Sequence, residues 1–200
     1  MADPTGPRLW LLRHAETEWS RSGRHTGRTD IPLTDRGRDV ARRLGEHLRG
    51  RRFALVLSSP LSRARETAQL AGLKDEQIRD DLLEWDYGDY EGLTTKQIRE
   101  QRPDWFLWRD GAPGGEQPAD VAARCDRVIE EAAGAGGDVA VAAHGHVLRV
   151  LAARWVGEEA AFGSRLHLHT GALSVLGMER ETRVLLLWNA TPAAGELEDA

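Results

Sequence analysis

The stretch WLLRHAETEW, residues 10–19, passes from apolar to charged in a single step. Its first residues continue Leu9 into a short apolar run, which is typical of a buried strand. Arg13 and His14 follow directly, where a chain that leaves a core usually takes a turn residue such as Gly, Asn or Asp. This placement raises the question of what a cation and an imidazole meet at the end of a buried strand.

The size and composition indicate one folded domain. The 200 residues, 40% apolar and 30% charged, predict a single domain over residues 1–200, with tails at 1–7 and 191–200. The formal net charge of −5 argues against general nucleic-acid binding. An anionic ligand therefore requires a local positive pocket.

Several sequence features favour a cytoplasmic protein without a membrane partner. The stretch MADPTGPR, residues 1–8, lacks the cationic and apolar segments of a signal peptide, and no apolar run approaches the length of a membrane span. A single cysteine, Cys125, excludes an intrachain disulfide. It shares one predicted helix face with Val121 and Val128, so we expect a small buried residue and not a nucleophile.

Short apolar runs alternate with helical patterns along the chain. Strands are predicted at 8–13, 53–57 and 138–143, and a hairpin of two strands within 172–188. Helices are predicted from Thr34, at 118–133 and at 144–156. A further helix is predicted with Ser59 as its N-cap and Pro60 at its first position. This alternation predicts an α/β three-layer sandwich, with a mostly parallel central sheet and helices on both faces.

The ends of three predicted strands carry the polar residues of interest. In a parallel sheet the site lies at the carboxyl ends of the strands. The first strand ends in Arg13 and His14, and the second is followed by Arg63 in the first turns of a helix. The third ends in His144, Gly145 and His146. We therefore expect these side chains to share one pocket, which answers part of the opening question.

Such a pocket suits a phosphate group. Arginine presents a planar fork of donors that matches phosphate oxygens, and a helix N-terminus near Arg63 adds backbone N–H groups. A neutral histidine is a competent nucleophile when its other ring nitrogen is held by an acceptor. A leaving alkoxide then needs a proton from a carboxyl group. The residues themselves leave four candidates for that group: Glu84, Asp86, Asp89 and Glu91.

Four ordered motifs resemble those of a known family. LLRHAETEW, SSPLSRARETA, EWDYGDYEGL and AAHGHVLRVL are similar, in order and spacing, to the histidine phosphatase superfamily, the phosphoglycerate-mutase-like family with an RHG motif. The resemblance covers roughly residues 8–188 and is nearest to small acid-phosphatase and sugar-phosphatase members. It implies a phosphoglycerate-mutase-like fold.

The resemblance also implies a role for each matching residue. His14 would be the phosphorylated nucleophile, Glu84 the proton donor, and His144 part of the phosphate cradle. Arg13 and Arg63 would hold the phosphoryl oxygens, so that no metal and no cofactor is expected. Further substrate or phosphate contacts are expected from the polar and small residues Ser20, Thr26, Gly27 and Gly145.

The chain departs from the mutase pattern at several positions. Ala15 stands where the family usually has Gly after RH, and we expect only a minor backbone adjustment there. A mutase lysine would fall at Thr95, one place before Lys96. Where mutases carry two arginines, residues 104–116 offer only Arg109. These departures favour hydrolysis over return of the phosphoryl group to a bound acid.

The predicted function is therefore a metal-independent, acid-phosphatase-like phosphomonoesterase. It would hydrolyse small phosphorylated metabolites through a phosphohistidine, with an acidic pH optimum because Glu84 must be protonated in the first step. The alternatives are a cofactor-dependent phosphoglycerate mutase and, less favoured, a non-catalytic phospholigand-binding protein. Analogy with the family suggests a homodimer.

Other residues stay open at this point. His146 either contacts the pocket or only begins a helix. His167 and His169 would share a strand face, where packing is favoured over a metal site because no acidic ligand pattern lies nearby. Tyr87 and the tryptophans near it are expected to shape the substrate end of the pocket.

Overall fold

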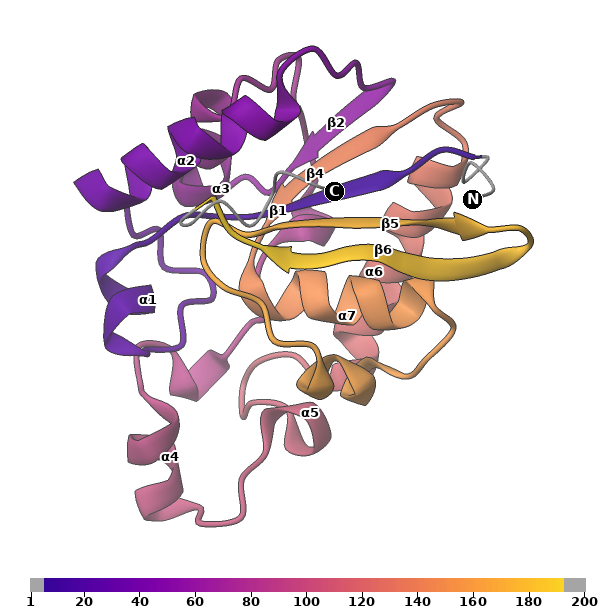
Figure 1. Cartoon of the computed structure of the whole chain (residues 1–200). Helices are drawn as coiled ribbons and strands as arrows, with labels where there is room; N and C mark the ends of the chain where they lie inside the picture. The colour runs from indigo at the N-terminus through magenta and orange to yellow at the C-terminus, as the bar shows by residue number, and fades with distance from the viewer. Residues whose placement is uncertain (1–5, 193–200) are drawn as a thin grey trace.

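A six-stranded sheet forms the centre of the molecule (Figure 1). The computed structural model describes residues 6–192, and the expected tails lie mostly outside that range. The strands are β1 (Leu9–Arg13), β2 (Leu55–Ser58), β3 (Gln77–Ile78), β4 (Val139–Ala143), β5 (Leu173–Glu179) and β6 (Thr182–Ala190). Their order across the sheet is β3-β2-β4-β1-β5-β6. The neighbours β3, β2, β4 and β1 pair in parallel. β5 is antiparallel to β1, and β6 is antiparallel to β5. The prediction of a mostly parallel sheet is therefore confirmed.

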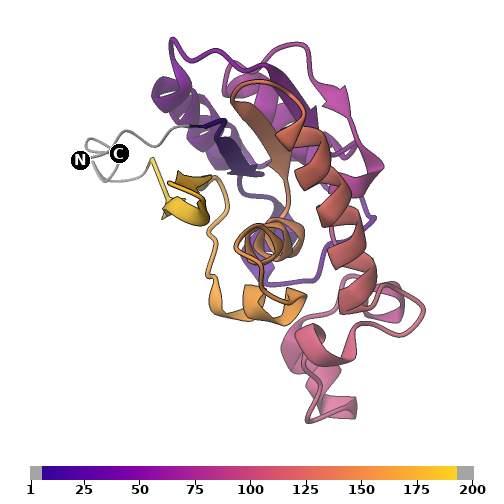
Figure 2. The same ribbon diagram turned by 90° about the vertical axis from the view of Figure 1, so that its right-hand side faces the viewer.

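Helices cover both faces of the sheet. The helices are α1 (Glu18–Ser22), α2 (Asp35–Leu48), α3 (Ser62–Leu70), α4 (Thr95–Gln101), α5 (Leu107–Asp110), α6 (Pro118–Ala133) and α7 (Gly145–Trp155), with 3-10 turns at Asp80–Leu82, Gly88–Tyr90 and Ala160–Arg165. In Figure 2 the sheet lies between α2, in violet, and α6, in salmon. The three layers predicted from the alternating pattern are confirmed.

The alternation of side chains along β1 explains why its apolar run has no polar break. Leu9 and Leu11 belong to the core under α6 and α7, whereas Trp10 and Leu12 belong to the core under α2 and α3. Successive side chains of a strand point to opposite faces, so a strand covered on both sides must be apolar at every position. β1 also pairs with β4 on one edge and with β5 on the other, so it is an interior strand covered on both faces and both edges.

Two N-cap residues were predicted, Thr34 and Ser59, and the second prediction is wrong. Thr34 caps α2 as expected, since its side chain accepts a hydrogen bond from the Gly37 N–H. Ser59 does not cap α3, which begins three residues later at Ser62 and has Leu61 as its N-cap without a side-chain bond. The Ser59 hydroxyl is instead engaged by a distant histidine, a contact that no local pattern signals.

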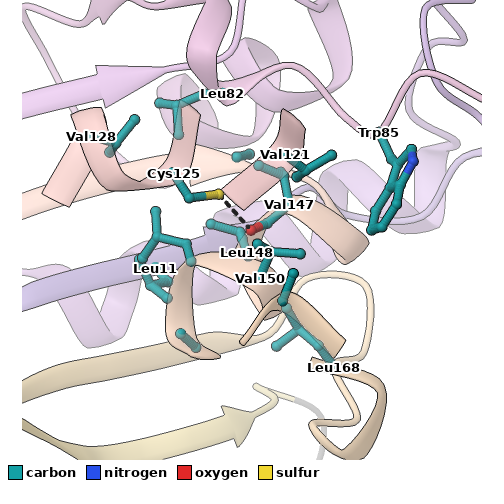
Figure 3. Close-up of a cluster of buried hydrophobic side chains, with 14 of the residues drawn as sticks. Leu11, Leu82, Trp85, Val121, Cys125, Val128, Val147, Leu148, Val150 and Leu168 are labelled. Carbon is teal, nitrogen blue, oxygen red and sulfur yellow. Dashed lines mark hydrogen bonds between the residues drawn. The ribbon is translucent and has the colours of Figure 1, made fainter. Parts of the chain in front are cut away.

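Cys125 lies in the core between α6 and α7, as Figure 3 shows. Its thiol donates to the carbonyl of Val147 at 3.6 Å, and burial raises the pKa of the thiol to about 12. A thiol that stays protonated is a poor nucleophile, so the expectation of a small buried residue is confirmed.

The segment between β3 and α6 is the part of the fold that the sequence pattern described least. It contains α4, α5 and two 3-10 turns, and in Figure 1 it extends away from the sheet below α1 and α7. Its helices are too short to show a clear apolar period. No helix within residues 6–192 combines the length and the apolar character needed to cross a membrane.

Replacing Leu12 by Ala tests the two-sided burial of β1. Leu12 is fully buried, so the variant should lose about 2–5 kcal/mol of unfolding free energy through lost burial and a residual cavity. Urea unfolding followed by circular dichroism measures the change. The control, Leu186→Ala on β6, removes a leucine that is 39% exposed and should change stability by less than about 1 kcal/mol. Equal losses in both variants would contradict the assigned core.

Candidate active site

The carboxyl ends of β1, β4 and β2 bring the predicted histidines together. β4 pairs in parallel with both other strands, so the residues that follow the three strands leave the sheet side by side. His14 follows β1 and His144 follows β4, and the centroids of their rings are 5.2 Å apart. Both histidines are buried, as is Arg63 in the first turn of α3.

The ring of His14 is held in one tautomer. Its Nδ1 lies 2.8 Å from the carbonyl oxygen of Ala15, which can only accept, so Nδ1 carries the proton and Nε2 the lone pair. Burial, followed by the positive charges of Arg63 and Arg13, lowers the pKa of His14 well below its usual value. His14 therefore presents a neutral ring with a free lone pair on Nε2.

The two guanidinium groups are held almost entirely by backbone carbonyls. Arg63 donates from Nη1 to Thr29 O at 2.8 Å, and from Nη2 to Thr26 O at 3.1 Å and Gly27 O at 2.9 Å. Arg13 donates from Nη1 to the carbonyl of Leu168, while its buried Nε has no hydrogen-bond partner within the described chain. Among the described residues neither arginine pairs closely with a buried carboxylate, so both positive charges remain unneutralised; Arg13 lines the cavity beside His14, whereas Arg63 is absent from its lining.

His144 links Arg63 to a serine. Its Nδ1 accepts from Arg63 Nε at 3.1 Å, and its Nε2 lies 2.7 Å from the Ser59 hydroxyl. Because a guanidinium only donates, the neutral ring carries its proton on Nε2. Burial lowers the pKa of His144 well below its usual value, with a further contribution from Arg63. Ser59 is a site residue that the sequence interpretation missed.

The structure distinguishes the four carboxyl groups that the sequence offered as candidate proton donors. Glu84 is buried and lines the cavity beside His14. Its carboxylate accepts three backbone N–H bonds, each 2.9 Å long, from Trp85, His146 and Val147. The last two are the first N–H groups of α7, where a helix end favours a negative charge.

The other three carboxyl groups lie outside the cavity lining. Asp86 accepts from the Gly88 N–H and pairs with Arg28 at 3.4 Å, and Asp89 is exposed. Glu91 accepts from the N–H groups of Gly27, at 2.9 Å to each oxygen, and of Thr29, at 3.1 Å. Glu91 thus fixes the loop whose carbonyls hold Arg63, a positioning contact that the sequence did not reveal.

Two glycines allow close approach at the site. A Cβ atom on Gly27 would lie 2.6 Å from a Glu91 carboxylate oxygen and 2.7 Å from the carbonyl of Trp85. A Cβ atom on Gly145 would lie 3.1 Å from the guanidinium of Arg13. Neither glycine lines the cavity, and each acts by leaving space for the groups that do.

A cavity of about 180 Å³ opens above His14. Its lining consists of Arg13, His14, Ser20, Gly23, Arg24, His25, Thr26, Glu84, Tyr87 and His146. Ser20 and Thr26 are among the predicted contacts, and His146 both begins α7 and lines the cavity. A larger cavity of about 660 Å³ lies away from these groups, beside the C-terminal end of α2.

Aromatic residues surround His146. Tyr87 forms a 2.6 Å hydrogen bond with its Nδ1, and the rings of Trp85 and Trp108 lie 6.4 Å and 5.3 Å away between centroids. Trp105 packs against His25 at 5.5 Å. Of these aromatic residues only Tyr87 lines the cavity, while the tryptophans support its wall from behind.

Some of the singled-out residues lie elsewhere. His167 and His169 are in an exposed loop rather than in a strand, with Nε2 and Nδ1 3.4 Å apart. Within residues 6–192, no group of three His, Cys, Asp or Glu side chains is arranged to hold a metal ion. Lys96 on α4 and Arg109 on α5 are absent from the cavity lining.

The sequence matches a family model over nearly its whole length. The model of the histidine phosphatase superfamily (branch 1) matches residues 9–191. The chain is 44% identical to an acid phosphatase of Mycobacterium tuberculosis, over 92% of this chain and 93% of that protein. It is 40% identical to the sedoheptulose 1,7-bisphosphatase of Saccharomyces cerevisiae, over 76% of this chain and 68% of that protein.

Two further comparisons bear on the alternatives and on the fold. The chain is 34% identical to a 2,3-bisphosphoglycerate-dependent phosphoglycerate mutase of Mesorhizobium japonicum, over 88% of this chain and 94% of that protein. A solved structure of a Mycobacterium tuberculosis protein superposes with a TM-score of 0.88 at 43% identity, covering 94% of this chain and 99% of the other.

Replacing Glu91 by Ala tests its hold on the loop. The variant removes the acceptor of the Gly27 and Thr29 N–H groups, so Arg63 should lose its fixed position and kcat/KM for a phosphate ester should fall about tenfold. Glu91→Gln, which keeps one acceptor oxygen, should recover part of this loss. The control is Asp89→Ala, an exposed carboxyl in the same segment. Equal activity of all three variants would contradict the role of Glu91.

The buried histidines should also make stability depend on pH. Folding lowers the pKa of His14 and of His144 below the unfolded value of about 6.5, so below that pH only the unfolded chain gains these protons. The free energy of unfolding should therefore fall by about 1.4 kcal/mol per histidine for each pH unit below about 6.5. Urea titrations between pH 7.5 and 5 measure the slope. A His14→Asn variant should show a smaller slope, and a flat profile in the native chain would refute the argument.

Proposed function

This chain belongs to the histidine phosphatase superfamily, and we propose that His14 carries the phosphoryl group during its reaction. The protein is a phosphatase that acts on small phosphorylated metabolites, in keeping with its acid phosphatase and sugar bisphosphatase relatives. The observation that carries the proposal is the neutral His14 ring, with its lone pair on Nε2, beside the guanidinium groups of the buried Arg63 and the half-buried Arg13.

In the first step Nε2 of His14 attacks the phosphorus atom of the bound ester. The N–P bond forms as the bond from phosphorus to the ester oxygen breaks, and Glu84 gives its proton to the departing oxygen. Arg13 and Arg63 bind the phosphoryl oxygens, whose charge they balance more strongly in a buried site than in water. His144 acts through Arg63, whose Nε donates to its Nδ1, because the Nε2–H of His144 is bonded to the Ser59 hydroxyl.

In the second step a water molecule releases the phosphoryl group. The Glu84 carboxylate takes a proton from water as the water oxygen attacks phosphorus and the N–P bond breaks. This returns the His14 lone pair, leaves Glu84 protonated and yields inorganic phosphate. The cavity that contains both His14 and Glu84 supports this sequence of steps.

The mutase alternative is less well supported. A mutase must grip the carboxylate of its acid substrate so that the phosphoryl group returns to it. Lys96 and Arg109, the nearest matches to the basic residues of mutases, lie outside the cavity lining, and Arg109 is paired with Asp110. The mutase relative is also less similar to this chain than the two phosphatases. The preserved set of His14, Glu84 and the arginines argues against a non-catalytic binding protein.

Three further features of the protein are proposed. A single domain over residues 1–200 is supported by the family match to residues 9–191. A cytoplasmic location accords with a lone buried cysteine, since disulfides are rare in reducing compartments. A homodimer is proposed by analogy with the family alone, and sedimentation of the purified chain tests it.

Removing the nucleophile tests the proposed chemistry. The His14→Ala variant should lose at least about 10³-fold in kcat for phosphate release from a phosphomonoester, because no other group offers the lone pair. The matched control is His47→Ala on α2. A chelator should leave the native rate unchanged, since guanidinium groups balance the charge. Activity that survives in His14→Ala and disappears with the chelator would overturn the mechanism.

The lowered pKa of His14 predicts activity in acid. A histidine with the usual pKa of about 6.5 is largely protonated at pH 5, which would reduce kcat/KM about 30-fold relative to pH 7.5. Because burial and the two arginines lower the pKa of His14, its lone pair persists and no such loss should occur. A pH–rate profile from 7.5 to 5, at a temperature where the chain stays folded, measures this. A decline centred near pH 6.5 would contradict a neutral His14.

A further inference from the structure

The cavity has an inner and an outer part. The inner part, where the proposed chemistry places the phosphoryl group, consists of Arg13, His14, Ser20 and Glu84. The outer part is lined by Gly23, Arg24, His25, Thr26, Tyr87 and His146, and would face the leaving group. The cavity has a volume of about 180 Å³ and opens at the exposed Gly23 and Arg24, past which a longer leaving group would extend.

The side chains of this outer wall are almost all uncharged. Burial lowers the pKa of His25 to about 4, and burial together with Arg149 lowers the pKa of His146 well below its usual value. Burial also raises the pKa of Tyr87, which keeps its phenol protonated. Arg24 is the one cation of the outer lining, and it is exposed, with its guanidinium 5.8 Å from the ring centroid of Trp19.

The wall is nevertheless rich in hydrogen-bonding groups. The Tyr87 hydroxyl and Nδ1 of the neutral His146 ring form a 2.6 Å hydrogen bond, which leaves Nε2 as the second polar atom of that ring. Nε2 of His25 lies 3.3 Å from the Thr95 hydroxyl, which leaves Nδ1 as its second polar atom. Neutral imidazoles offer donors and acceptors suited to hydroxyl groups, without a charge to balance an anion.

We propose that the outer wall selects an uncharged, hydroxylated leaving group, so that the preferred substrates are sugar or polyol phosphates rather than phosphorylated carboxylic acids. This inference rests on the proposed function and specifies its substrate class. A carboxylate on the leaving group would lose its hydrating water against neutral side chains that do not balance its charge. Hydroxyl groups of the leaving group can form hydrogen bonds with His25, Tyr87 and His146, and the free energy lost by removing them from water is small.

Two esters of equal size separate these substrate classes. Glycerol 3-phosphate and 3-phosphoglycerate share the phosphate group and a three-carbon chain, and differ in a hydroxymethyl group against a carboxylate. Phosphate release should show kcat/KM at least about tenfold higher for glycerol 3-phosphate. Equal values, or a preference for the acid, would overturn the inference while leaving the phosphatase function intact. Failure to release phosphate from either ester would overturn both.

A charge exchange at His25 tests the cause of the preference. His25→Arg adds a cation to the wall and should shift the ratio of the two kcat/KM values about tenfold towards 3-phosphoglycerate. His25→Gln keeps a neutral polar side chain and should change that ratio by less than about threefold. The ratio is measured on one preparation, so a partly unfolded sample does not alter it. Equal shifts in both variants would show that shape and not charge decides, and would refute the proposal.

Two further variants complete the test. His47→Arg makes the same exchange on α2, away from the cavity, and should leave the ratio unchanged. Arg24→Gln removes the only cation of the outer lining, and glycerol 3-phosphate should remain the better substrate. If the native chain instead favours 3-phosphoglycerate and loses that preference in Arg24→Gln, then Arg24 is a carboxylate-binding residue and the neutral wall is wrong.

Discussion

The guanidinium group of Arg63 is the centre on which the site depends. It is fully buried, yet its nearest carboxylate, Asp30, is partly exposed and 3.9 Å away. Three backbone carbonyls and one imidazole hold it in place. Carbonyl dipoles satisfy the N–H groups but do not neutralise the charge. With the half-buried Arg13, whose Nε has no hydrogen-bond partner among the described residues, Arg63 makes the site positive, which suits an anionic ligand.

This positive field explains the state of the histidines around it. Burial and the arginine charges together disfavour imidazolium, so His14 and His144 stay neutral. Burial, aided by the arginine charges that suit an anionic ligand, thus keeps the lone pair of the proposed nucleophile available. Each tautomer follows from the hydrogen-bonding neighbour of the ring. The carbonyl of Ala15 can only accept a hydrogen bond from His14, and Arg63 can only donate one to His144. Binding and reactivity therefore have the same physical origin.

The two ends of the cavity come from different parts of the fold. The phosphate end is built on strand termini and helix starts, whose positions follow from the hydrogen-bond register of the sheet. The leaving-group end uses the 23–26 loop and the segment after β3, where Glu84 and Tyr87 lie among short turns. Glu91 joins the two ends, because it ties the loop to that segment and the loop in turn holds Arg63. Substrate preference can therefore change without altering the sheet.

The sequence by itself determined the layers of the fold and the meeting of Arg13, His14, Arg63 and His144. An uninterrupted apolar strand is buried on both faces, and parallel strands place their carboxyl ends at one edge, so both inferences need only local patterns. The residue pattern left four carboxyl groups open, and only the tertiary structure shows that Glu84 alone of the four lines the cavity, against the start of α7.

Tertiary contacts alone also revealed Ser59 and Glu91. Ser59 was expected to cap a helix but meets His144, 85 positions along the chain, and Glu91 holds an N–H group 64 positions away. Such long-range contacts produce no periodic pattern in the sequence, because they form between loops that the packed sheet brings together. Residue patterns thus specify where a chain places its elements, whereas the protonation and orientation of each side chain depend on neighbours that only folding supplies.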